Sequence, residues 1–283
     1  MSNPGTPGIV LAGFGSGADL VRRMARSRKC GSGGEMRIDH SSCVIFIGNG
    51  PDVQRQASET LNSGQLPELL GSAAVVFMIS DGVELIRTSR LAARIAEAND
   101  LAVMVFLVAG GEGGGPREDR GLRHLNHELL RGRGPAVVVD APSEPDDAEL
   151  RLAKMVSCIS NMLLEPSIIN LDLADLRTVM RCGTEACIIS GTGPSPESAL
   201  RDALDRSSGL LDMRRARGCL LHITGGITLT LRDANHIAES MTGAIDPEAN
   251  VIWGMRVRGD LERIEITSVL TGKNILHGSR NAV

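Results

Sequence analysis

The stretch Ile169–Met180 reads I-N-L-D-L-A-D-L-R-T-V-M and joins an acidic loop to a helix. Asp172 stands where the helix begins, so its carboxylate can accept hydrogen bonds from the unpaired N–H groups of the first turn. Helix capping of this kind accounts for one of the two acids. Two carboxylates on a tight loop can also orient water and hold a cation beside a phosphoryl group.

Before this stretch, apolar runs alternate with helical patterns. Fully apolar strands separated by helices are typical of a parallel sheet covered on both faces, with ligands bound at the carboxyl ends of the strands. The longest helical pattern, Asp146–Leu164, is apolar on more than one face, which predicts a buried central helix that Pro166 ends. The expected strands are Gly8–Ala12, Cys43–Ile47, Ala73–Ile79, Leu101–Val108 and Ala136–Val139.

After this stretch the pattern is mixed. Expected strands are Ala186–Ser190, Gly218–Thr224, Asn250–Arg258 and Ile264–Leu270, and expected helices are Ser195–Ser207 and Asp233–Met241. The short link Gly259–Asp260 predicts that the last two strands form an antiparallel hairpin. The sequence therefore predicts an α/β protein with a parallel Rossmann-type sheet domain at 1–145, a long central helix at 146–165, and a smaller mixed α+β domain at 166–283.

Composition excludes several classes of function. The chain has 283 residues, a net charge of −4, four Phe, one Trp and no Tyr. A single-strand nucleic-acid binder needs aromatic platforms, and a general nucleic-acid or anionic-membrane binder needs a basic excess. No apolar stretch is long enough to insert into a membrane, and the first residues lack the features of a secretory signal. Six cysteines without C-x-x-C spacing predict a reduced, cytoplasmic protein without a metal site.

A family resemblance covers residues 148–272. The helix run Val156–Ser160, the Ile169–Met180 stretch, Leu220–Leu231 (L-L-H-I-T-G-G-I-T-L-T-L) and Ala249–Gly254 (A-N-V-I-W-G) resemble FtsZ, the bacterial homologue of tubulin. This resemblance implies an FtsZ/tubulin-like fold. It also implies that the acidic loop of one filament subunit completes the nucleotide site of the next, and it gives that role to Asn170, Asp172 and Asp175. We therefore favour an inherited interface over capping alone.

The phosphate-binding half is similar more loosely. The glycines of the first phosphate loop are matched by Gly13, Gly15 and Gly17, but the family's G-G-G-T-G-T-G loop is replaced by S-D-G-V-E-L-I from residue 80, where only Gly82 remains. Asp81 and Glu84 put carboxylates where phosphates would lie. Two like charges ~4 Å apart repel by about 4 kcal/mol at an effective dielectric constant of ~20.

The other nucleotide contacts that the resemblance implies are Arg117, with Glu112 beside it, and Glu149. With the signature loop reduced, we expect a degenerate pocket in which GTP or GDP binds weakly or not at all, with Mg²⁺ present only when nucleotide binds. The sequence therefore predicts little or no intrinsic GTP hydrolysis.

Three functions stay open. The first is a cytoskeletal, cell-division type of protein that assembles head-to-tail with itself or with FtsZ through longitudinal contacts. The second is a GTP-hydrolysing filament protein with a divergent pocket. The third is a non-filamentous scaffold or membrane-remodelling module. The segment after Gly272 has only eleven residues, so we expect no FtsZ-type C-terminal anchor peptide. No nucleic-acid partner is expected.

Overall fold

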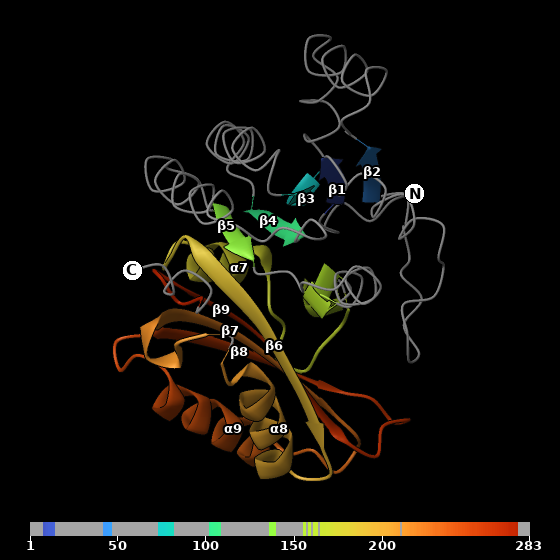
Figure 1. Cartoon of the computed structure of the whole chain (residues 1–283). Coiled ribbons are helices and arrows are strands. Elements are labelled where there is room, and N and C mark those ends of the chain that lie inside the picture. Colours follow the sequence, from blue (N-terminus) through green and yellow to red (C-terminus); the bar gives the residue numbers. More distant parts are fainter. Residues whose placement is uncertain are drawn as a thin grey trace. The chain divides into compact units, whose positions relative to one another are not determined.

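The computed structural model describes the backbone of residues 8–14, 42–46, 73–81, 102–108 and 136–139, and of residues 155–276 except 157, 160, 164 and 210. The chain divides into two compact units, Met1–Ser160 and Asn161–Val283. Figure 1 shows both, and each is described here by itself.

The first unit contains a parallel sheet. Its strands are β1 (Gly8–Phe14), β2 (Ser42–Phe46), β3 (Ala73–Asp81), β4 (Ala102–Val108) and β5 (Ala136–Val139), in the order β2-β1-β3-β4-β5. Every described pair of these neighbours is parallel, as the apolar runs predict. Phe77 and its ladder partner Met104 are both fully buried. Strand β3 continues two residues beyond the expected Ile79, and Asp81 pairs with Val108 instead of opening the loop.

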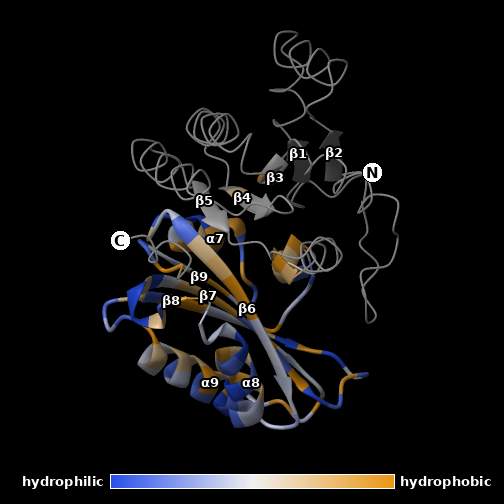
Figure 2. Cartoon of the chain, in the orientation of Figure 1, coloured by the Kyte–Doolittle hydropathy of each residue, from blue (hydrophilic) through white to orange (hydrophobic). Residues whose placement is uncertain are grey.

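The second unit contains a mixed sheet of β6 (Glu185–Gly193), β7 (Ala216–Gly225), β8 (Asn250–Val257) and β9 (Ile264–Gly272). The order is β6-β9-β7-β8. Strand β9 is antiparallel to both β6 and β7, whereas β7 and β8 are parallel. Figure 2 shows hydrophobic colours along these strands and hydrophilic colours on the turns.

The expected hairpin of the last two strands is wrong. Strands β8 and β9 follow each other in the chain, but β7 lies between them in the sheet. The connection crosses the end of β7: Arg258 N donates to Gly225 O at 2.8 Å, and a Cβ on Gly226 would lie 2.1 Å from Leu261 O. The glycine allows this close crossing, so the short link reaches past one strand to the next position.

Two helices cover one face of this sheet, α8 (Pro196–Ser207) and α9 (Leu231–Ala244). Residues of both helices, such as Ala203 and Ile237, form one buried cluster with Leu221, Ile223 and other inward side chains of the strands. Each helix begins with a capping box, Ser195–Ser198 for α8 and Thr230–Asp233 for α9. A short 3₁₀ turn, η1 (Met213–Arg215), precedes β7.

The opposite face carries α7 (Leu173–Met180). Thr271 Oγ1 donates to Val179 O at 2.6 Å, and a Cβ on Gly218 would lie 2.7 Å from the same oxygen. Of the expected central helix, the described residues between 155 and 163 are helical, and Val156, Ile159 and Met162 are buried there. None of the helices in the described ranges is long and apolar enough to cross a membrane.

Candidate functional site

The acidic loop is fixed to strand β8. Ile169 forms an antiparallel bridge with Met255: Met255 N donates to Ile169 O at 3.0 Å, and Ile169 N donates to Met255 O at 3.1 Å. Leu171 is buried against Gly254, where an added Cβ would lie 2.7 Å from Leu171 Cγ and 2.8 Å from Ile169 O. A glycine is therefore required for the loop to lie this close to the sheet.

The two carboxylates of the loop hold each other in place. Asp175 N donates to Asp172 Oδ1 at 2.9 Å, and Asp172 N donates to Asp175 Oδ2 at 2.9 Å. This is a complete capping box, so capping uses both acids and not the single acid that the sequence suggested. Each carboxylate keeps one oxygen that no described residue bonds. The pair therefore presents two unused acceptors in a fixed geometry.

Asn170 closes the preceding turn. Its Oδ1 accepts from Ser167 N at 2.9 Å, and the residue is exposed. Asn170, Asp172 and Asp175 thus lie on one short ordered segment, and their catalytic role stays a prediction. Each of the three side chains has a local structural role there, and the free carboxylate oxygens are what remains for chemistry: they can accept from water or bind a cation.

Large apolar side chains are exposed near the C-terminal ends of β7 and β8. Ile168 is 62% exposed directly before the bridge, and Ile227 and Leu231 are 82% and 56% exposed between the end of β7 and the first turn of α9. The hydrogen bond from Arg258 to Gly225 ties that β7–α9 loop to the C-terminal end of β8, and Ile168 is bonded to Met255 near the same end. Exposed apolar residues of this size are typical of contact surfaces.

A buried polar cluster lies on the same sheet face as Gly254. His222 is the ladder partner of Gly254 and is 7% exposed; its Nδ1 lies 3.4 Å from Thr224 Oγ1, and its Nε2 has no partner among the described residues. Burial, with a smaller contribution from Arg256, lowers the pKa of His222 to about 4. Arg256 itself is ion-paired with Glu165. His222 is therefore neutral at physiological pH.

His222 lies in the FtsZ-like string Leu220–Leu231, but the sequence pattern predicts no role for it. The sequence signal that could have found it is a single titratable residue within an otherwise apolar strand, which indicates a buried histidine.

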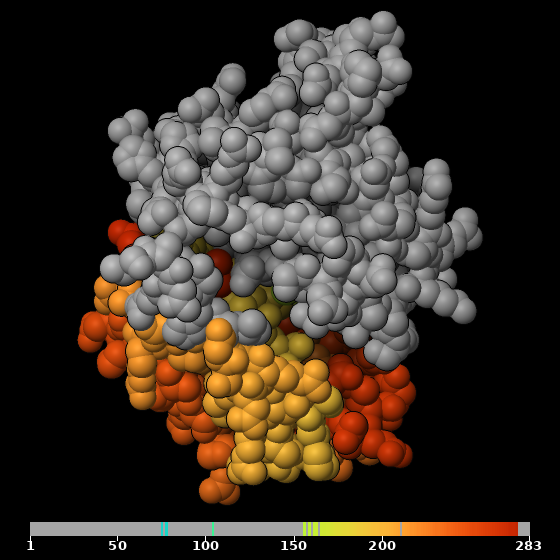
Figure 3. All heavy atoms as spheres, viewed as in Figure 1, coloured from blue at the N-terminus to red at the C-terminus, as the bar shows by residue number. Residues whose placement is uncertain are grey.

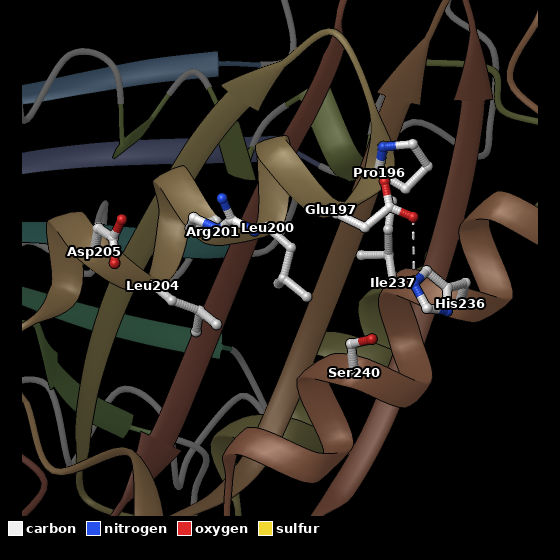
Figure 4. A pocket seen from close by; sticks show the side chains of 9 residues that line it. All are labelled: Pro196, Glu197, Leu200, Arg201, Leu204, Asp205, His236, Ile237 and Ser240. Carbon is white, nitrogen blue, oxygen red and sulfur yellow. Dashed lines mark ion pairs between the residues drawn. The ribbon is translucent and has the colours of Figure 1, made fainter.

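A shallow pocket of about 250 Å³ lies between α8 and α9 (Figure 4). Leu200 and Ile237 lie at its buried side, and His236 Nε2 lies 3.6 Å from Glu197 Oε1 at its rim. Residues of α8 reach the surface of the second unit in the space-filling view (Figure 3). The described residues contain no His, Cys, Asp and Glu grouping that could hold a metal ion. Ser240 and His236 both line the pocket, but no hydrogen bond joins their side chains, so the described residues show no activated nucleophile there.

Most of the residues expected to contact the nucleotide lie outside the part of the chain that the structure describes. Gly13 belongs to β1, where it pairs with Phe46 and Ile79. The remaining candidates lie outside the described residues: Gly15, Gly17, Gly82, Glu84, Glu112, Arg117 and Glu149.

Known proteins resemble the chain in sequence. Residues 183–274 match the C-terminal domain of the FtsZ family. The cell division protein FtsZ 2 of Methanocaldococcus jannaschii is 40% identical over 128 residues, which are 43% of this chain and 34% of that protein. The FtsZ 2 of Haloferax volcanii is 28% identical over 250 residues, which are 81% of this chain and 61% of that protein. The chain thus spans about a third to three fifths of the length of these relatives.

Solved structures resemble it in fold. An empty FtsZ dimer of M. jannaschii superposes with a TM-score of 0.67 at 19% identity, covering 94% of this chain and 88% of that one. A CetZ of Methanosaeta thermophila gives 0.70 at 15% identity, with 94% and 86% covered. A GTPγS-bound CetZ2 protofilament of H. volcanii gives 0.61 at 16% identity, with 94% and 93% covered. The expected α/β, FtsZ/tubulin-like fold is confirmed, and the match of residues 183–274 to the FtsZ C-terminal domain supports the resemblance to the FtsZ/tubulin superfamily.

Proposed function

We propose that the chain is an FtsZ-like subunit that associates head-to-tail with itself or with an FtsZ and presents its acidic loop to the nucleotide of the neighbouring subunit. Its own site then binds GTP or GDP weakly and hydrolyses little. The observation that carries the proposal is the reciprocal pair of Asp172 and Asp175, which fixes two carboxylates on an exposed loop and leaves one oxygen of each unused.

The loop suits a role in a neighbour's site because it is already ordered. The bridge to Met255 and the buried Leu171 fix its backbone, so no ordering cost falls on binding or on the transition state. The free oxygens can orient an attacking water and hold a cation near a phosphoryl group. The exposed Ile168 and Ile227 supply apolar contact area near the same end of the unit.

One feature supports a weakened nucleotide site in the chain itself. Asp81 ends β3 at the carboxyl edge of the parallel sheet, the edge at which such sheets bind ligands. A carboxylate there repels phosphate unless a cation intervenes.

The alternative, a GTP-hydrolysing filament protein with a divergent pocket, is favoured by the likeness to a GTPγS-bound CetZ2 protofilament.

Pelleting with a purified FtsZ and GTP tests the proposal. Asp175→Gln removes a carboxylate but keeps an N3 side chain that can close the capping box. Asp233→Gln is the matched control, because Asp233 closes the same box on α9. We expect the wild type and Asp233→Gln to change the amount of FtsZ that pellets, and Asp175→Gln to lose most of this effect. Absence of any association by the wild type would refute the proposal.

The nucleotide content of the purified chain separates the two candidates. Release of bound nucleotide by denaturation, followed by chromatography, should give far less than one guanine nucleotide per chain. A stoichiometric amount, with hydrolysis by the chain alone, would favour the divergent GTPase instead.

A further inference from the structure

Among the described residues, no strand pairs with the outer edge of β8. Strand β8 ends the sheet order, with β7 on one side. Met255 points its N–H and C=O away from β7, since both bond the Ile168–Ile169 segment. Because these directions alternate along a strand, the N–H and C=O of Trp253 and Val251 point outward too. Neither residue has a hydrogen bond to a described residue on that side.

The loop leaves this edge where the free groups begin. After Ile169 the chain turns inward, and Leu171 packs on Gly254, so nothing in the described ranges continues the pairing past Met255. The free stretch Asn250–Gly254 contains no charge and no proline, and Val251, Ile252 and Trp253 are only half-buried. Edge strands are usually protected by charge, proline or a bulge, and an unprotected edge is a template for another strand.

We propose that this edge pairs with the same edge of a second copy of the chain, antiparallel, around a two-fold axis at Ile252. In that register Val251 of one copy lies opposite Trp253 of the other. The two positions exchange both hydrogen bonds, and symmetry repeats the exchange. All four outward groups of each copy are used, in four hydrogen bonds. Ile252 faces its own symmetry mate as a non-hydrogen-bonded pair.

The side chains agree with this register. Val251 opposite Trp253 is a β-branched residue against an aromatic one, a favourable cross-strand pair. The turn before β8 folds back toward β7, with Asp246 N donating to Ala216 O at 3.3 Å. The pairing between the two copies therefore ends where Asn250 of one copy lies opposite Gly254 of the other, one residue before the bridge at Met255.

This contact does not depend on the proposed function. It uses the β8 edge and leaves Asp172 and Asp175 free. A head-to-tail contact is heterologous and open-ended, whereas a two-fold contact is closed. A subunit with both contacts would join two filaments in antiparallel orientation.

Sedimentation equilibrium of the whole chain without nucleotide tests the dimer. Val251→Pro removes an outward N–H and leaves the β7 ladder intact, because that N–H does not face β7. Val251→Ala is the matched control that keeps the N–H. We expect the wild type to dimerise, Val251→Pro to weaken the dimer at least about tenfold because two of four hydrogen bonds are lost, and Val251→Ala to weaken it less. A monomeric wild type at all concentrations would overturn the proposal.

A disulfide cross-link tests the register even if the proline variant fails to fold. Non-hydrogen-bonded antiparallel partners have Cα atoms about 4.5 Å apart, within the range of a disulfide. Ile252→Cys should therefore give a covalent dimer on mild oxidation, in excess of the wild type with its own cysteines. Asn250→Cys lies opposite Gly254 of the partner and should not. Equal cross-linking by the two variants would exclude the two-fold axis at Ile252.

Discussion

The two faces of the second unit's sheet are closed in different ways. Toward α8 and α9, the face is filled by apolar side chains such as Leu221 and Ile237, all deeply buried. Toward α7 and the acidic loop, closure depends on glycines at 218 and 254, on the hydroxyl of Thr271, and on the buried, neutral His222. The first face supplies stability, and the second positions the loop. The two properties should therefore be separable by substitution.

The largest loss of stability is expected on the apolar face. Ile237→Ala leaves a cavity in the cluster beneath α9 and should lower the free energy of unfolding by about 2 to 5 kcal/mol. Urea unfolding measures this loss. At temperatures where the variant is still folded, its association with FtsZ should equal that of the wild type, because no contact of the acidic loop changes. A selective loss of association would show that the two faces are coupled.

The polar face should make stability depend on pH through His222. Its folded pKa is lowered to about 4 from an ordinary 6.5, so the folded state favours the neutral ring. The contribution is fully present above pH 6.5 and is lost as pH falls toward 4, in total about 3 kcal/mol. Unfolding of wild type and His222→Asn, compared from pH 7 to 4.5, isolates it. Parallel curves for the two proteins would contradict this assignment.

A smaller loss is expected where the loop meets β8. Gly254→Ala puts a methyl group against Leu171 and the Ile169 carbonyl, which must shift, at a cost of about 1 to 3 kcal/mol. Association should fall with it, since the loop is displaced. Gly243→Ala in α9 is the control: a Cβ there meets nothing within 4 Å, and the substitution should stabilise by up to about 1 kcal/mol. If both variants bind FtsZ equally well, loop placement is not what matters.

The smallest change in stability should carry the largest change in function. Asp172→Ser keeps a good N-cap residue but removes a carboxylate, so unfolding should shift by less than about 1 kcal/mol. Association with FtsZ should nevertheless be lost. Pelleting and urea unfolding of the same preparation compare the two effects directly. If Asp172→Ser still associates with FtsZ but has a lower free energy of unfolding, Asp172 acts only as a helix cap.

The sequence predicted the strands well because apolar runs and their breaks are local signals. The segment Ala136–Val139 has the expected bounds, and β6 and β7 extend theirs by only a few residues. Strand order is not local. The link at Gly259–Asp260 suggested a hairpin, yet five consecutive buried residues from Ser268 show that β9 is a central strand. The sequence does contain a signal for burial on both faces, because Ser268–Gly272 is an unbroken run of small and apolar residues.

The catalytic role of the acidic-loop residues stays a prediction, and their detailed geometry was not predictable from the sequence. Asn170, Asp172 and Asp175 do share one segment, whereas the reciprocal bonds between the two acids follow from backbone geometry that a one-dimensional spacing does not contain. His222 was missed because its neutrality arises from burial by residues distant in the chain. The dependence of the loop on Gly254 was missed for the same reason: the contact joins residues more than eighty positions apart.

The central claim is that the acidic loop acts in a neighbour's nucleotide site. The most direct measurement is phosphate release from GTP by an FtsZ whose own acidic-loop carboxylates are replaced by alanine, with this chain added in trans. We expect the wild type and Asp233→Gln to restore hydrolysis, and Asp175→Gln not to restore it. No restoration by the wild type, or equal restoration by Asp175→Gln, would contradict it.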